Sequence, residues 1–386
     1  MGSAYDFQIP VQFQHRIRFG RSFFDRANPS LIDLLEVGFA TRRVLAFVDE
    51  GLLELVPDLE QQVANYFTDR EDFEFCGLVA LPGGEQAKAD DQVLTQAWNA
   101  IDQANIDRHS YVFAIGGGAF LDVIGFAAAT AHRGVRLVRF PTTTLSQDDS
   151  GVGVKNGINS FSKKNWIGSF AVPFAVINDF DYLHLQPEKQ RRDGLVEAVK
   201  VAAVKDAEFF NWIEANVESL AALDEPVLEE AVERSAILHA KHIAQGGDPF
   251  ETGSSRPLDF GHWAAHKLEQ LTNFELSHAE AVGIGLALDV LYSVLSGRLP
   301  KEQGERILRV LEGLKVDTWH PQLAMEDPQS GLPIILDGLE EFREHLGGRL
   351  TVLFLNDIGS PMDLHEVNHA TVIQALTAMK LRQPCD

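Results

Sequence analysis

The sequence is poor in cysteine and in positive charge. Two cysteines among 386 residues, Cys76 and Cys385, are too few for a disulfide framework, and no metal-binding cysteine pattern surrounds either one. Lys and Arg number 33 against 56 Asp and Glu, which gives a formal net charge of −23. This excess of negative charge disfavours nucleic acid and anionic membranes as partners. We therefore expect a reducing, cytoplasmic location, where the surplus charge confers solubility.

Targeting signals and long apolar runs are missing as well. The first residues lack a basic stretch followed by an apolar one, so no signal peptide is expected. We find no apolar run near the roughly 18 residues that cross a bilayer, and no internal repeat or low-complexity segment. With hydrophobic residues at 45%, the composition favours a globular chain of two domains or one large domain.

The first 180 residues alternate between strand and helix patterns. Strands are expected over 8–20, 43–48, 78–81, 111–115 and 135–140, and helices over 52–67, 93–106 and 123–131. This alternation predicts a parallel, Rossmann-like sheet with helices on both faces.

Helical periodicity dominates the second half of the chain. Helices are expected over 192–215, 226–245, 260–271, 278–295 and 301–314, with a late strand over 349–355. Ser277 and Glu280 have the spacing of a capping box, which would begin the helix at His278. We therefore predict an α/β domain over 1–180 and a mainly α-helical domain over 181–386.

Two segments of the first half have the composition of ligand-binding loops. Residues 142–165 follow Pro141 and combine hydroxyls, carboxylates, glycines and lysines, which suits a loop that binds a phosphorylated, hydroxyl-rich ligand. The alternative is a solvated surface loop. The turn Gly116–Gly118 joins a strand to a helix, where backbone N–H groups favour a pyrophosphate. It is not the G-x-G-x-x-G pattern, so tight strand–helix packing explains it equally well.

Histidines and one glutamate suggest a metal site. Of thirteen histidines, His262 and His266 lie at i and i+4 on one helical face, and His278 opens the next helix. With Glu197 they form a candidate Glu/His/His set that leaves an open coordination position, as in catalytic zinc sites. The alternative is a structural or surface histidine pair.

A series of motifs runs in one order between about residues 40 and 360. They are Gly116-Gly117-Gly118-x-x-x-Asp122, Arg133-Gly134, Pro141-Thr142-Thr143, Asp149-Ser150-x-x-x-x-Lys155, Lys164-Asn165, Gly194-x-x-Glu197-x-x-Lys200, Phe260-Gly261-His262-x-x-x-His266 and His278-x-Glu280. In this order and spacing the chain resembles the sugar phosphate cyclases, whose best-known member is 3-dehydroquinate synthase.

The resemblance implies a homodimer with an NAD-binding α/β domain, a helical Zn²⁺-binding domain (Co²⁺ being an alternative metal) and an active site in the cleft between them. By motif position the zinc ligands are Glu197, His262 and His278, which moves His266 to the substrate side. Residues matched to NAD contacts are Asp49, Glu85, Lys88, Gly117, Gly118, Asp122, Thr142 and Thr143. Residues matched to substrate contacts are Asp149, Lys155, Lys164, Asn165, Lys200, Lys241 and His266, while Arg133 would reach the substrate phosphate in the partner subunit.

The same resemblance implies a carbon–oxygen lyase acting on a sugar phosphate. NAD⁺ takes a hydride from a ring carbinol whose oxygen Zn²⁺ polarises, and the new ketone permits elimination of phosphate. The hydride is then returned, the ring opens, and an intramolecular aldol step closes the carbocycle.

The substrate preference depends on where the sequence departs from 3-dehydroquinate synthases. Ser255 stands at their arginine position and Asp259 at their asparagine position, while the segment 342–348, which contains His345, resembles cyclases of sedoheptulose 7-phosphate. A hydroxyl and an added negative charge should disfavour a substrate carboxylate. We therefore expect a valiolone-type C7 cyclitol as product, and the retained His266 favours 2-epi-valiolone.

Three other functions remain open from the sequence. Arg256 could restore a carboxylate contact, which would make the chain a 3-dehydroquinate synthase acting on 3-deoxy-arabino-heptulosonate 7-phosphate. A metal-dependent polyol dehydrogenase shares the overall fold and the Pro-Thr-Thr segment, although it needs no phosphate clamp. The third is an inactive, ligand-binding relative.

Overall fold

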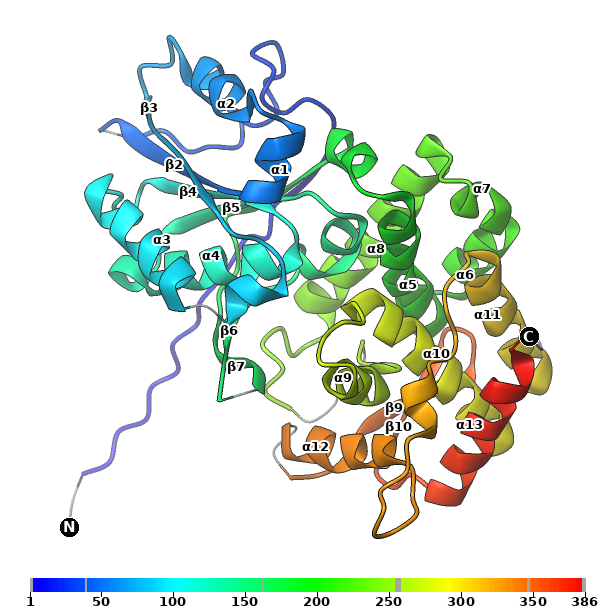
Figure 1. Ribbon diagram of the computed structural model, residues 1–386. Helices are drawn as coiled ribbons and strands as arrows, with labels where there is room; N and C mark the ends of the chain where they lie inside the picture. Colours follow the sequence, from blue (N-terminus) through cyan, green and yellow to red (C-terminus); the bar gives the residue numbers. More distant parts are fainter. Residues whose placement is uncertain are drawn as a thin grey trace.

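Strands are concentrated in the first half of the chain and helices in the second. The computed structural model describes residues 3–38, 40–89, 91–161, 163–253, 258–345 and 348–383, and only the backbone of His345. Figure 1 shows the sheet in the blue to blue-green part of the chain and the helical region in green to red.

Six strands form a parallel sheet in the order β1-β8-β5-β4-β2-β3. They are β1 (Ile17–Gly20), β2 (Arg42–Asp49), β3 (Phe73–Leu81), β4 (Tyr111–Gly116), β5 (Arg136–Pro141) and β8 (Ala175–Asp179). The central strands are nearly continuous buried runs, as expected where helices cover both faces. The predicted parallel α/β architecture is therefore confirmed.

Alternate residues of β2 pack into two separate hydrophobic cores. Val44, Ala46 and Val48 face the core shared with α1 (Glu50–Leu55) and α2 (Leu59–Phe67). Leu45 and Phe47 face the core shared with α3 (Asp91–Gln103) and α4 (Gly118–Thr130). Figure 1 shows these two helix pairs on opposite sides of the sheet, so the period-two side-chain alternation of a strand builds both layers.

The second half is mainly helical, as predicted. Its helices are α5 (Glu188–Lys205), α6 (Ala207–Ala215), α7 (Val217–Ala221), α8 (Glu225–Gln245), α9 (His262–Leu271), α10 (His278–Leu295), α11 (Lys301–Gly313), α12 (Asp337–His345) and α13 (His369–Arg382). Two antiparallel hairpins accompany them: β6 (Lys155–Ser160) with β7 (Lys163–Phe170), and β9 (Val352–Asp357) with β10 (Ser360–Leu364). The position of a domain boundary near residue 181 stays a prediction.

Two helices expected as single segments are broken. The pattern over 52–67 divides into α1 and α2 because Pro57 forces Val56 out of the helical conformation, with φ −129° and ψ 71°. The pattern over 192–215 divides at Asp206, which ends α5 and caps α6 by accepting a hydrogen bond from the Phe209 N–H. Both breaks arise from local chemistry that hydrophobic periodicity does not register.

The expected opening strand over 8–20 is largely absent. Only Ile17–Gly20 forms a strand, because the register with β8 covers those four residues and β8 adds before them a single hydrogen bond, from the Val176 N–H to the Arg16 carbonyl oxygen. The preceding segment, residues 3–16, is extended and leads away from the sheet to the N-terminus in Figure 1.

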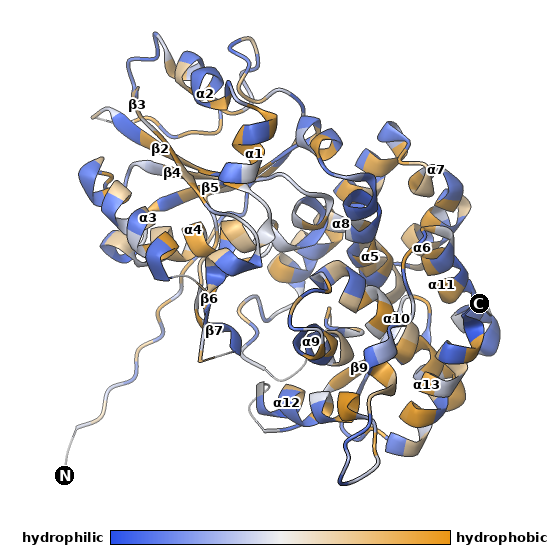
Figure 2. Ribbon diagram, in the orientation of Figure 1, coloured by the Kyte–Doolittle hydropathy of each residue, from blue (hydrophilic) through white to orange (hydrophobic). Residues whose placement is uncertain are grey.

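The expectation that no segment could span a membrane also needs correction. By length and composition α10 passes that test, but most of the helix is buried inside the protein. Figure 2 shows the corresponding apolar colouring along α10. Its hydrophobicity is accounted for by its central place in the helical core.

Arg139 is a charged residue at the centre of the sheet. It lies on β5, is fully buried, and donates hydrogen bonds to the carbonyl oxygens of Gly151, Gly153 and Lys155 and to the side-chain oxygen of Asn156. Burial lowers the pKa of this guanidinium. Arg139 therefore holds the segment that enters β6 against the sheet.

Replacing Arg139 with Met is expected to reduce the free energy of unfolding by about 3–4 kcal/mol, because four acceptors lose their donor inside the protein. Urea denaturation measures this change. Arg136→Met on the same strand is the control, since that partly exposed side chain pairs with Glu36 and should cost no more than about 1 kcal/mol. Equal losses in the two variants would contradict the role of Arg139.

Candidate active site

Three predicted metal ligands from three helices meet at one point. Glu197 lies on α5, and His262 and His278 are the first residues of α9 and α10. Each histidine Nε2 lies 3.9 Å from Glu197 Oε1, and one candidate ligand atom from each residue lies within 4.8 Å of the others. Glu197 is 1% exposed. A buried carboxylate and two converging imidazoles are the donor set of a divalent transition-metal site.

The two histidines meet because α9 and α10 approach closely. Gly261 has φ +81°, and a Cβ on Gly285 would lie 2.1 Å from the Gly261 carbonyl oxygen. Asp289 accepts hydrogen bonds from the Gly261 N–H and from Trp263 Nε1, which fixes the start of α9. The predicted capping box, in which Ser277 and Glu280 bond reciprocally, begins α10 at His278.

Each histidine is also held through its second ring nitrogen. His262 Nδ1 lies 3.2 Å from the Phe260 carbonyl oxygen, and His278 Nδ1 lies 3.4 Å from Glu269 Oε1. When Nδ1–H donates to these oxygens, the Nε2 lone pair is directed to the Glu197 side. The geometry therefore selects the tautomer that a metal requires.

Glu269 is a site residue that the sequence analysis missed. It is 1% exposed, and its Oε1 accepts a 2.7 Å hydrogen bond from Lys164 Nζ in addition to facing His278. Burial alone would raise the pKa of Glu269, but His278 and Lys164 lower it to about 2. One feature of the sequence indicates that Glu269 belongs to the site. It follows His262 by seven residues, which places both on the same face of α9.

A second group of charges adjoins the metal cluster. Asp149 belongs to the turn η3 (Ser146–Ser150), and its Oδ1 lies 2.9 Å from Nδ1 of His239, another residue that sequence reasoning missed. Burial alone would raise the pKa of Asp149, but His239 lowers it below the ordinary value. Lys200 is 2% exposed and pairs with Glu197. The predicted substrate residues Asp149 and Lys200 thus border the candidate ligands.

His266 and Asp259 also lie at this cluster. The His266 ring centroid is 5.6 Å from that of His262 and 6.0 Å from that of His278. Burial lowers the pKa of His266 to about 4, so its ring is neutral at neutral pH. Asp259 accepts a hydrogen bond from the His262 N–H through its backbone oxygen, and its charge acts on Lys200 and His266.

The predicted cofactor residues gather at the carboxyl edge of the sheet. Asp49, Gly116 and Pro141 are the last residues of the neighbouring strands β2, β4 and β5, and Gly117, Gly118, Thr142 and Thr143 follow directly. A Cβ on Gly83 would lie 1.9 Å from Asp49 Oδ2, and one on Gly118 would lie 2.4 Å from Ser150 Oγ. A side chain at either position would displace Asp49 or Ser150, so both turns favour bare backbone, as in sites where a dinucleotide crosses such an edge.

The remaining predicted cofactor residues form ion pairs beside that edge. Lys88, in the turn η1 (Glu85–Lys88), lies 2.6 Å from Asp122 on α4. Glu85 accepts a hydrogen bond from Asn159 on β6, and its Oε1 is 3.8 Å from Lys164 Nζ. Lys164 thus lies between Glu85 on the cofactor side and Glu269 beside the metal cluster.

The other predicted substrate residues are placed less centrally. Lys155 begins β6 and pairs with Glu251 at 2.6 Å, and the Asn165 N–H donates to Asn159. Lys241 is exposed on α8. Ser255 and Arg256 lie outside the described residues, as does the side chain of His345 at the end of α12.

Arg133 is remote from the glycine turn of its own chain. It is exposed in the short turn η2 (Ala131–Arg133), which follows the C-terminal end of α4. Because the glycine turn is at the other end of this 13-residue helix, the two are separated by about 20 Å.

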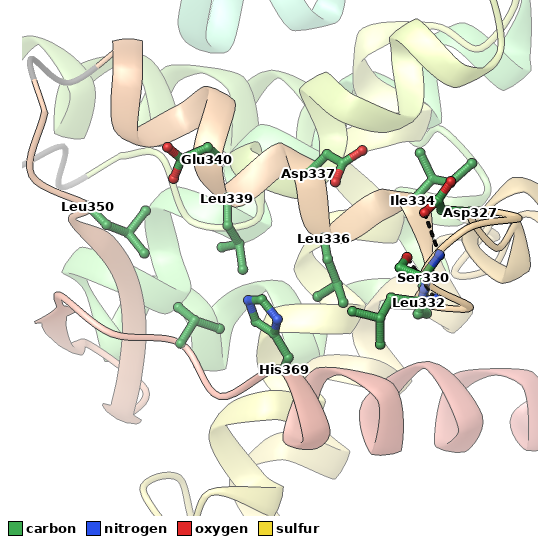
Figure 3. Close-up of a pocket in the computed structure, with 12 residues that line it drawn as sticks. Asp327, Ser330, Leu332, Ile334, Leu336, Asp337, Leu339, Glu340, Leu350 and His369 are labelled. Atoms are coloured by element: carbon green, nitrogen blue, oxygen red, sulfur yellow. Dashed lines mark hydrogen bonds between the residues drawn. The ribbon is translucent and has the colours of Figure 1, made fainter.

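A separate pocket does not coincide with this chemistry. Figure 3 shows a cavity of about 420 Å³ to which Leu336, Leu339 and His369 contribute. None of the site residues predicted from the sequence lines it. Cavity volume alone would therefore direct attention away from the cluster of ionisable groups, which is the better guide to catalysis.

Comparisons with known proteins identify related chains. Family models for the 3-dehydroquinate synthase N-terminal and C-terminal regions match residues 78–193 and 194–332. The 2-epi-valiolone synthase of Actinosynnema mirum is 31% identical over 363 residues, which cover 92% of this chain and 90% of that protein. The 3-dehydroquinate synthase of Methylococcus capsulatus is 34% identical over 284 residues, covering 73% and 77%. The structure of ValA, a 2-epi-5-epi-valiolone synthase from Streptomyces hygroscopicus subsp. jinggangensis with NAD⁺ and Zn²⁺ bound, has a TM-score of 0.86 and 26% identity, covering 98% of this chain and 100% of that one.

Proposed function

Since the chain belongs to the 3-dehydroquinate synthase family and is a sugar phosphate cyclase, we propose that it converts sedoheptulose 7-phosphate to a valiolone-type C7 cyclitol with loss of phosphate. 2-epi-Valiolone is the favoured product, supported by the similarity to a 2-epi-valiolone synthase over 92% of the chain. The structural observation that carries the substrate proposal is Asp259, whose negative charge acts at the cluster of Lys200 and His266. A second carboxylate, on the substrate, would be repelled there.

NAD⁺ and a divalent cation, Zn²⁺ or Co²⁺, are the proposed cofactors. Buried Glu197 forms an ion pair with Lys200 through Oε2, and the two histidine Nε2 atoms face its Oε1 at 3.9 Å, a donor set that suits such a cation. At the start of α4, Gly117 provides no side-chain cap, and the backbone N–H groups of such a helix N-terminus favour a pyrophosphate. When bound, NAD⁺ supplies reversible hydride transfer and the cation polarises the reacting oxygen.

The chain's own side chains are proposed to bind the substrate and to assist the reaction. Lys164, and Lys155 from the same hairpin, are proposed to bind the phosphate and to stabilise its charge as it leaves. Lys200 and the Asp149–His239 pair are proposed to orient the ring hydroxyls, since each charge is fixed by a partner. His266, whose ring is neutral at neutral pH because burial lowers its pKa to about 4, is proposed to accept a proton or a hydrogen bond on the substrate side.

A homodimer completes the proposal. Arg133 is about 20 Å from the glycine turn of its own chain and exposes its guanidinium on the surface. It is therefore proposed to reach the substrate phosphate in a partner subunit, as its motif position implies.

The rate of phosphate release from each of two sugar phosphates tests the substrate proposal. With NAD⁺ and Zn²⁺ supplied, kcat/KM for sedoheptulose 7-phosphate is expected to exceed that for 3-deoxy-arabino-heptulosonate 7-phosphate by at least about 100-fold, because burying an unmatched carboxylate is costly. Asp259→Asn should lower this ratio of the two kcat/KM values about 10-fold. Glu275→Gln, which removes an exposed charge after α9, should leave the ratio unchanged.

The opposite preference would identify a 3-dehydroquinate synthase and overturn the substrate proposal. Net accumulation of NADH with a simple polyol would instead identify a dehydrogenase. NMR of the isolated cyclitol distinguishes 2-epi-valiolone from its 5-epimer.

A further inference from the structure

In the segment before the sheet, residues 3–14 form an exposed arm with one apolar face. Its apolar side chains occur at every second position, Tyr5, Phe7, Ile9, Val11 and Phe13, and are 59% to 83% exposed. Figure 1 shows the arm extending away from the body, and Figure 2 shows apolar and polar residues alternating along it. Such a concentration of exposed apolar side chains marks an interaction site.

The pattern of the arm is that of an edge strand. Strict period-two alternation predicts a strand with one buried face. Pro10, which has no N–H to donate, falls on the opposite parity from the apolar residues. Residues of one parity direct their backbone groups to one neighbouring strand, so Pro10 faces the side that an edge strand leaves unpaired. The arm is therefore suited to pair with one neighbouring strand, on the side that Pro10 does not face.

Strand β7 (Lys163–Phe170) of the β6–β7 hairpin has an open edge with which the arm can pair. Among the described strands it pairs with β6 alone, and Trp166, Ile167 and Phe170 are 37% to 55% exposed. At the base of the arm Phe13 contacts Phe250, and Phe250 contacts Phe170, with ring centroids 6.0 and 5.6 Å apart. The arm thus leaves its own chain beside the same hairpin.

We propose that the arm of each chain adds as a strand to the open edge of β7 in a second copy of this chain, so that two subunits exchange arms. The inference deepens the proposed homodimer by naming the docking surface. Main-chain hydrogen bonds supply affinity, and the apolar face of the arm packs beside those exposed side chains of β7 that lie on the same face of the hairpin.

The buried area favours a second copy over an unrelated partner. Five largely apolar side chains bury on the order of 600 Å² of one arm and about as much of the surface that receives it, so reciprocal exchange buries about 2,400 Å² in total, above the roughly 1,200 Å² at which stable interfaces begin. A single arm seated on another protein buries half of the area that reciprocal exchange buries. The hairpin and the arm also occur on the same chain, which permits two-fold symmetry.

Sedimentation velocity without substrate tests the exchange. The wild-type chain is expected to be a concentration-dependent dimer, and F7Q/I9Q/V11Q to raise the dimer Kd by at least about 100-fold. The matched control Q8A/Q12A/Q14A alters the other face of the same arm and should leave Kd unchanged. Because these side chains are exposed in a single subunit, the monomer should stay folded in both variants, which thermal unfolding verifies.

Hydrogen exchange locates the docking edge. In the dimer, amides of the arm and of β7 are expected to be protected, and to lose that protection together on dilution or in F7Q/I9Q/V11Q. A monomeric wild-type chain, an unchanged Kd in that variant, or arm protection that persists in the diluted monomer would each overturn the proposal. Absence of turnover on the sugar phosphates would count against the proposed function alone, since neither measurement here uses activity.

Discussion

Replacing Glu197 with Gln is expected to release the bound divalent cation and to lower phosphate formation from sedoheptulose 7-phosphate by on the order of 1,000-fold. Glu197 is the one anion in the candidate ligand set, and its carboxylate is buried between the two histidine Nε2 atoms. An amide keeps the volume but removes the charge that offsets a dication. Metal content of the purified variant and its rate of phosphate release are the measurements.

Glu188→Gln is the matched control for that experiment. Glu188 lies at the start of the same helix, α5, is exposed, and pairs with Arg192 at 3.4 Å. The control should retain metal and activity, since an exposed pair of this kind contributes little to stability. Full metal occupancy in Glu197→Gln would show that the cation binds elsewhere.

Replacing Glu269 with Gln is expected to weaken metal binding by about 10- to 100-fold, the usual effect of removing a carboxylate that orients a ligating histidine. Glu269 faces His278 Nδ1 at 3.4 Å and is 1% exposed, so water does not replace it at that position. Competition with a chelator of known affinity measures the change. The absorption spectrum of the Co²⁺-loaded protein reports any altered ligand geometry independently of turnover.

Two further variants separate the roles of Glu269. Lys164→Met removes its other partner and is expected to raise KM for the sugar phosphate while leaving metal affinity within about 3-fold, because His278 keeps its acceptor. Glu341→Gln breaks the 2.6 Å pair with Lys267 on another side of α9 and should change neither quantity. If Glu269→Gln binds metal as tightly as the wild-type chain, Glu269 has only a structural role.

The candidate site was predicted from the sequence to the extent that its residues lie in motifs. Glu197, His262 and His278 were assigned by motif position, and the structure brings them within reach of one ion. His262 and His266 at i and i+4 alone suggested a different pair, because helical spacing describes one helix and a metal site joins several. Glu269 and His239 were missed because their significance arises from partners on other elements.

Structural features that depend on only a few neighbouring residues were also predictable from the sequence. Strand alternation, the glycine turn and the capping box at Ser277 are properties of short segments, and each is present in the structure. The breaks at Pro57 and Asp206 are equally local, although hydrophobic periodicity passes over them. By itself, then, the sequence determined the alternation of strands and helices in the first half, the helical character of the second half, the family and the candidate ligands.

Tertiary structure alone decided which of these pieces meet. Residues 8–16 carry the alternation of a strand, yet in the structure they form none, since the register with β8 covers only Ile17–Gly20. Lys164 and Glu269 are separated by 105 positions and share a 2.7 Å hydrogen bond. The physical reason is common to both cases. Propensity and periodicity act over a few residues, whereas strand pairing, ion pairing and metal binding need a partner that only the folded arrangement brings within reach.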